Sequence, residues 1–149
     1  MDRRLERLND EEKEELFELF EALSNSSKIQ NENVIGKLYR LMDKTDSYEL
    51  IDHKNEMIEF QQKVYQKVWD EAKELRHDEK LIEYARGLDC PVVAIHGAYD
   101  PHPYEGVKEP LSDILDDFKF VLLDRCGHYP WYERYARDEF LQIIRDELE

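Results

Sequence analysis

Two residues suited to acid–base chemistry, Asp100 and His128, each follow an apolar segment near the C-terminal end of the chain. The two segments, Val92–Ile95 and Phe118–Leu123, have the length and composition of buried strands. A carboxylate beside an imidazole can accept a hydrogen bond from one ring nitrogen, orient the ring and stabilise its protonated form. Because parallel strands end at one edge of a sheet, we expect the two turns to meet there.

The first half of the chain is predicted to be helical. Residues 9–12 are typical of a helix start, with acidic side chains in the first turn. Asp78 is expected to cap a short helix over Glu79–Arg86 that ends at Gly87. The apolar residues that recur at helical spacing are Leu16, Leu19, Phe20 and Leu23, then Val34, Leu38, Leu41 and Met42, then Met57, Phe60, Val64, Val68, Ala72 and Leu75.

The second half alternates strands and helices. The run Val92–Ile95 predicts a strand buried on both faces, and Phe118–Leu123 predicts a second strand. A helix is predicted over Val107–Leu115, and Arg137–Leu148 is a closing amphipathic helix with Phe140, Leu141, Ile144 and Leu148 inward. This order implies an α/β fold class with two parallel strands joined by a right-handed crossover.

Two motifs suggest a family. They are Pro91-Val-Val-Ala-Ile-His-Gly-Ala-Tyr-Asp100 and Cys126-Gly-His128-Tyr-Pro-Trp131-Tyr-Glu133, followed by the closing helix. Residues 88–149 thereby resemble the C-terminal part of an α/β-hydrolase of the lipase, esterase and aminopeptidase-like type. The resemblance implies a truncated α/β-hydrolase-like fold, with Asp100 as the acid and His128 as the base of a Ser-His-Asp triad. It also implies that residues 1–87 form a helical lid-like region ahead of the β-α-β-α segment.

The nucleophile of such a triad has no counterpart in this sequence. The serines are Ser24, Ser26, Ser27, Ser47 and Ser112, and none lies between glycines on a strand-to-helix turn. Acyl transfer needs a nucleophile, a base and oxyanion donors within hydrogen-bond reach. The sequence therefore predicts a hydrolase for ester or amide bonds that is incomplete as a single chain, with a nucleophile from another segment. The alternative is a non-catalytic binding or interaction module that retains the pocket at the sheet edge.

Two other chemistries are weighed for the same residues. The side chains of His96, Asp100, His102 and His128 are of types that bind zinc, but their spacing matches no strong metal signature, so we expect no metal and no cofactor. Cys126 is a candidate substitute nucleophile, although neighbours two residues apart on one turn rarely face each other.

The loop after His128 is rich in aromatic residues. This aromatic cluster consists of Tyr129, Trp131, Tyr132 and Tyr135. It either lines a substrate pocket or packs against the helical region, and packing is the commoner arrangement. Glu133 is expected to brace the loop through hydrogen bonds rather than to transfer protons.

Composition limits the partners. The 149 residues suit one domain, and a net charge of −15 repels phosphate backbones and anionic lipid, so we expect no nucleic acid and no membrane. The start, Met1-Asp-Arg-Arg-Leu-Glu, lacks the apolar stretch of a secretory signal. Cys90 and Cys126 make no disulfide framework, and both are expected to be buried free thiols beside strands. We therefore expect the protein to be cytoplasmic.

A sheet of two parallel strands has open edges that invite pairing. We therefore expect a homo-oligomer, most simply a dimer, that covers a sheet edge or an apolar face of the chain. The expected substrate is a small-molecule ester or amide.

Overall fold

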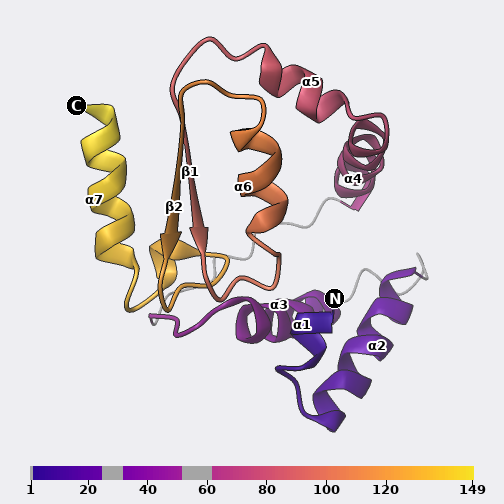
Figure 1. Cartoon of the computed structure of the whole chain (residues 1–149). Helices are drawn as coiled ribbons and strands as arrows, with labels where there is room; N and C mark the ends of the chain where they lie inside the picture. Colours follow the sequence, from indigo (N-terminus) through magenta and orange to yellow (C-terminus); the bar gives the residue numbers. More distant parts are fainter. Residues whose placement is uncertain (1, 25–31, 52–61) are drawn as a thin grey trace. The chain divides into compact units, whose positions relative to one another are not determined.

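A computed structural model describes residues 2–24, 32–51 and 62–149. Two strands are hydrogen-bonded neighbours and run parallel, so the described chain is of mixed α/β class, as predicted (Figure 1). The elements in chain order are α1 (Asp2–Leu5), α2 (Asp10–Ser24), α3 (Glu32–Asp46), α4 (Gln62–His77), α5 (Lys80–Arg86), β1 (Val92–Gly97), α6 (Glu105–Ser112), β2 (Phe118–Leu123), the 3-10 turn η1 (Pro130–Tyr132) and α7 (Arg137–Leu148).

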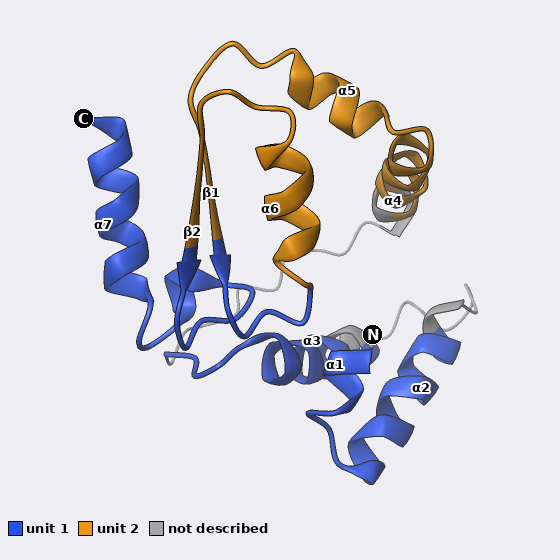
Figure 2. Ribbon diagram, in the orientation of Figure 1, with its two compact units in different colours: residues 1–51, 96–102, 122–149 blue, residues 52–95, 103–121 orange. Residues whose placement is uncertain are grey.

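Contacts between residues divide the chain into two compact units (Figure 2). Unit 1 comprises residues 1–51, 96–102 and 122–149, and unit 2 comprises residues 52–95 and 103–121. Asp100 and His128 both belong to unit 1. These units are defined by contacts between residues. The expected division into residues 1–87 and 88–149 is defined by the sequence pattern instead, and it stays a prediction.

The apolar core of unit 1 lies between its helices. Four leucines are buried together, Leu8, Leu16, Leu19 and Leu41, and Leu5, Val34, Leu38 and Met42 pack against them. Leu16 and Leu19 of the stripe predicted for α2 therefore face the stripe predicted for α3, whereas Phe20 is exposed. Leu23 belongs to the same predicted stripe, but its side chain lies outside the described part of the structure. The predicted start of α2 is confirmed, because Asn9 Oδ1 accepts a hydrogen bond from Glu12 N (2.8 Å) and Glu12 Oε2 accepts one from Asn9 N (3.0 Å).

The strands and the last helix lie close to their predicted positions. The bounds of β2 and α7 are as predicted, whereas α6 begins two residues before the predicted helix and ends three residues before its predicted end. The prediction that β1 is buried on both faces is wrong, since its residues from Val92 to His96 are only half-buried. Among the described residues each strand has a neighbour on one side only, which leaves it less covered. Leu148, predicted to point inward, is 82% exposed.

Two predicted details of the helices and thiols are wrong, and one is confirmed. Glu79, not Asp78, lies at the N-terminal cap of α5, with a left-handed backbone (φ 58°) and no side-chain capping bond. Gly87 ends α5, as predicted, although its φ of −83° is not the left-handed conformation that often follows a helix. Cys90 is exposed, although both cysteines are free thiols.

The long helical stretch before residue 78 is only partly described. Met57 and Phe60, which were expected to belong to its apolar face, lie outside the described residues. Within α4, Val64, Val68 and Trp69 are exposed. None of the helices in the described ranges combines the length and the apolar character needed to cross a membrane.

Candidate functional site

Asp100 and His128 lie within hydrogen-bond distance of each other. Asp100 follows β1 by three residues, and His128 follows β2 by five. The distance from His128 Nδ1 to Asp100 Oδ2 is 2.7 Å. Because an ionised carboxylate only accepts hydrogen bonds, Nδ1 carries the proton and donates it. The structure therefore brings together the two residues that the sequence singled out. Their contact uses Nδ1 of His128, so Nε2 of the same ring is left for other chemistry.

The Asp100 carboxylate is buried and fully engaged. Its residue is 5% exposed, and its Oδ1 accepts hydrogen bonds from the backbone N and from Nδ1 of His102, both at 2.8 Å. Burial alone would raise the pKa of Asp100, but the hydrogen bonds from His128 and His102 outweigh it and hold the pKa well below its ordinary value. Asp100 is thus a fixed negative charge beside the imidazole.

His128 combines a fixed backbone with an open ring. Its backbone N donates to the carbonyl of Asp46 (2.6 Å), and its side chain is 43% exposed. The hydrogen bond to Asp100 raises the pKa of His128 above that of free histidine, although partial burial opposes the shift. Asp100 therefore orients the ring and stabilises its protonated form, as the acid residue of an Asp–His pair does.

Two glycines permit close backbone contacts around the Asp100–His128 pair, Gly97 with the turn after β2 and Gly127 with the end of α3. A Cβ atom on Gly97 would collide with backbone atoms of Cys126 and Gly127, and a Cβ on Gly127 would collide with Asp46 and Ser47. Tyr99 N donates to the carbonyl of Cys126 (2.8 Å), which joins the two turns directly. The Asp–His pair thus depends on backbone contacts that only glycine permits.

Glu133 braces the histidine turn, as the sequence predicts. The residue is fully buried, and its Oε1 accepts hydrogen bonds from Gly127 N (2.7 Å) and Tyr48 N (2.8 Å). Its Oε2 accepts one from Glu49 N (2.8 Å). One carboxylate therefore joins the segment after α3 to the turn that carries His128.

Arginines near the N-terminus also support the site, and sequence reasoning did not identify them. Arg4 forms two hydrogen bonds of 2.6 Å with the carboxylate of Asp46, the residue whose carbonyl holds His128. Arg7 donates to the carbonyls of Thr45 and Tyr99 and lies over the Tyr99 ring. A usable signal was the presence of three arginines among the first seven residues of a strongly acidic chain.

The described residues close to His128 offer poor nucleophiles. Ser47 Oγ is buried and has no hydrogen-bond partner, so it is not bonded to His128. Burial, with the negative charge of Glu133 nearby, raises the pKa of Cys126 to about 12. Because the thiolate is the reactive form, Cys126 is unsuited to the role of substitute nucleophile.

The aromatic cluster begins next to the Asp100–His128 pair. The ring of Tyr129 lies 5.0 Å from that of His128, and Trp131 continues the chain of rings at 5.9 Å. Trp131 also contacts Phe140 of α7, at 6.0 Å between ring centroids. Tyr135 lies near Tyr48, at 6.1 Å. The cluster therefore packs within unit 1, while its exposed rings, Trp131, Tyr132 and Tyr135, keep surface open to solvent.

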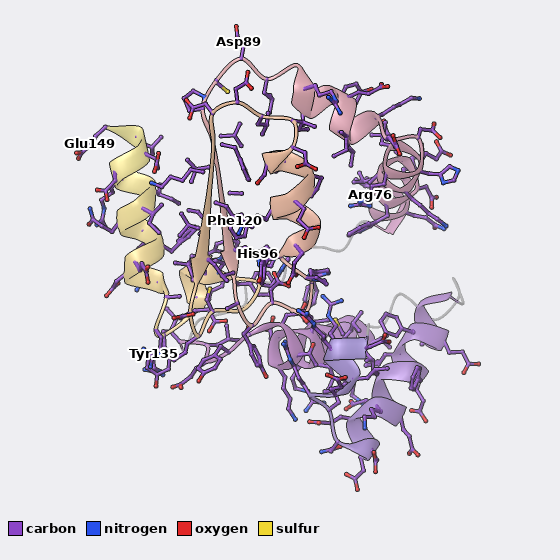
Figure 3. The ribbon with its side chains drawn as sticks, viewed as in Figure 1. Arg76, Asp89, His96, Phe120, Tyr135 and Glu149 are labelled. Carbon is purple, nitrogen blue, oxygen red and sulfur yellow. The ribbon has the colours of Figure 1, made fainter. Side chains whose placement is uncertain are left out.

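The residues weighed as zinc ligands divide into two sets. Donor atoms of Asp100, His102 and His128 all lie within 4.8 Å of one another. His96, at the end of β1 (Figure 3), is not among them; its Nε2 lies 3.8 Å from Asp100 Oδ2, and its Nδ1 donates to the Gly97 carbonyl.

Comparison with protein-family models, with curated proteins and with solved structures gave no match to this chain. The resemblance to α/β-hydrolases therefore stays a prediction from the sequence motifs.

Proposed function

We propose that this chain carries the acid–base half of an α/β-hydrolase site that acts on ester or amide bonds. The observation that supports it most is the 2.7 Å hydrogen bond from His128 Nδ1 to the buried Asp100 carboxylate. In a triad, this bond fixes the tautomer in which Nε2 can accept a proton from the attacking hydroxyl and later donate it to the leaving group.

The exposure of the two side chains fits these roles. A carboxylate that only orients its partner can be buried, as Asp100 is, whereas the base must reach the substrate, and the His128 side chain is 43% exposed. Ser47 and Cys126 are unsuited to the role of nucleophile, so we expect the nucleophile from another segment, of this chain or of a second copy in the purified oligomer.

Replacing His128 with alanine tests the proposal. Purified protein is assayed with activated esters and aminoacyl amides, and we expect turnover to fall by about 10²–10⁴-fold in His128→Ala, the range for loss of a general base. Asp100→Asn should also lose turnover, because the ring would take the wrong tautomer. The matched control is His77→Ala, an exposed histidine at the end of α4. Absence of turnover in the unaltered protein, or equal turnover in His128→Ala, would contradict the proposal and favour a binding module.

The proposal includes a homodimer. In the described chain β1 and β2 form a two-stranded sheet, and the outer edges of so small a sheet invite pairing. A second copy that adds its strands would extend the sheet. Light scattering after size exclusion is expected to give about twice the monomer mass of 18.0 kDa. A monomer at micromolar concentration would contradict this part.

A further inference from the structure

We propose that Asp100, His102 and His128 bind one divalent transition-metal ion, with zinc the best match. Three of the five histidines of the chain lie around the Asp100 carboxylate, and two of them contact it. Donor atoms of Asp100, His102 and His128 lie within 4.8 Å of one another. The inference rests on this grouping and does not depend on the proposed hydrolase function.

The spacing of the two rings fits a shared ion. The centroids of the His102 and His128 rings are 5.1 Å apart, with 47° between the planes. A zinc–nitrogen bond of about 2.0–2.1 Å puts each ring centroid about 3.2 Å from the ion. At a tetrahedral angle, two such centroids lie about 5.2 Å apart. The rings are therefore already separated as two imidazoles on one ion would be.

The carboxylate is placed to be the third ligand. Asp100 Oδ1 lies 2.8 Å from His102 Nδ1, and Oδ2 lies 2.7 Å from His128 Nδ1. Ligands of one tetrahedral zinc ion are about 3.3 Å apart, so each ring nitrogen would withdraw by about half an ångström from the oxygen that it contacts when the ion replaces the bridging protons. Because the two nitrogens contact different oxygens, the rings would also turn toward one shared ion. The histidine side chains are 54% and 43% exposed, which leaves them free to move and gives the ion access.

The donor set points to the class of metal. Imidazole nitrogens with one carboxylate suit zinc and neighbouring transition metals, whereas calcium and magnesium prefer oxygen ligands throughout. A backbone hydrogen bond also holds the carboxylate in place, since the backbone N of His102 donates to Asp100 Oδ1. Three protein ligands leave the fourth position of a tetrahedral ion for water, as in catalytic zinc sites.

The test is a calorimetric titration of the full chain with zinc chloride after treatment with a chelator. We expect one equivalent to bind and to raise the thermal unfolding midpoint, because an ion bound only by the folded state stabilises it. Cobalt(II) added instead should give visible absorption bands typical of low coordination number.

A variant outside the Asp–His pair identifies the site. His102→Ala removes a ligand but leaves the hydrogen bond between His128 and Asp100, and it should weaken zinc binding by more than about 100-fold, since loss of outer partners alone costs 10–100-fold. His77→Ala should bind zinc as the unaltered protein does. Absence of zinc binding, or binding retained in His102→Ala, would overturn the proposal.

The same samples keep the two proposals apart. Turnover that requires His128 in chelator-treated protein, without zinc binding, would retain the hydrolase proposal and reject the metal site. Zinc binding that requires His102, without any turnover, would retain the metal site alone.

Discussion

Glu133→Ala is expected to destabilise the protein strongly. The side chain is fully buried and is the acceptor for three backbone N–H groups, those of Tyr48, Glu49 and Gly127. Each buried donor without a partner costs about 1–3 kcal/mol, so the free energy of unfolding should fall by roughly 3–5 kcal/mol or more. That is a large part of the 5–15 kcal/mol typical of a domain.

A graded series distinguishes loss of acceptors from loss of charge. In Glu133→Gln the amide oxygen can keep the two bonds made by Oε1, and only the bond from Glu49 N is lost, so the destabilisation should be smaller. Glu18→Ala, an exposed position on α2, is the control and should change stability little. Urea unfolding followed by circular dichroism gives the free energy of unfolding of each of the three variants. Equal stability of Glu133→Ala and Glu18→Ala would show that Glu133 is not the brace described above.

Gly127→Ala is expected to disrupt the Asp–His pair as well as the fold. The added Cβ would lie under 3.0 Å from a backbone oxygen of Asp46, from Ser47 Cα and from Glu133 Oε1, closer than real Cβ contacts. The two backbone segments must separate, and overpacking of this kind costs about 1–3 kcal/mol or more. His128 is the next residue and takes its position from the Asp46 carbonyl, so its ring should leave Asp100.

Two further glycines provide the comparison. Gly97→Ala should be as damaging, because its Cβ would meet the backbone of Cys126 and Gly127. Gly106→Ala is the matched control, since it lies in α6 with nothing within 4 Å of the added atom. It should stabilise the protein by about 0.5–1 kcal/mol, the helix preference of alanine over glycine. Thermal unfolding gives the stabilities, and the imidazole signals of His128 in NMR report its environment. A Gly127→Ala protein as stable as Gly106→Ala would contradict the close packing.

Local pattern was enough to predict the elements that carry the site. The apolar runs gave β2 and α7 within their observed bounds, and the expectation that parallel strands end at one edge put Asp100 near His128. Those inferences need only the residue types along one segment and a general rule of sheet geometry.

Contacts between distant segments could not be predicted in the same way. The Arg4–Asp46 ion pair joins residues 42 positions apart, and the bonds of Glu133 to Tyr48 and Glu49 cross more than 80 positions, so no spacing rule predicts them. The half-burial of β1 depends on how many strands flank it, and the left-handed backbone of Glu79 depends on the helices on either side. Such features follow from tertiary packing, which a single sequence does not display.

The last residue of α3 limits how this protein can change in length during evolution. Asp46 ends that helix, and its carbonyl sets the position of His128 while its carboxylate binds Arg4. One residue inserted within α3 would turn its end by about 100° and advance it by about 1.5 Å. The histidine would then lose its anchor. Insertions and deletions among related chains should therefore avoid α3 and fall in segments that carry no such contact.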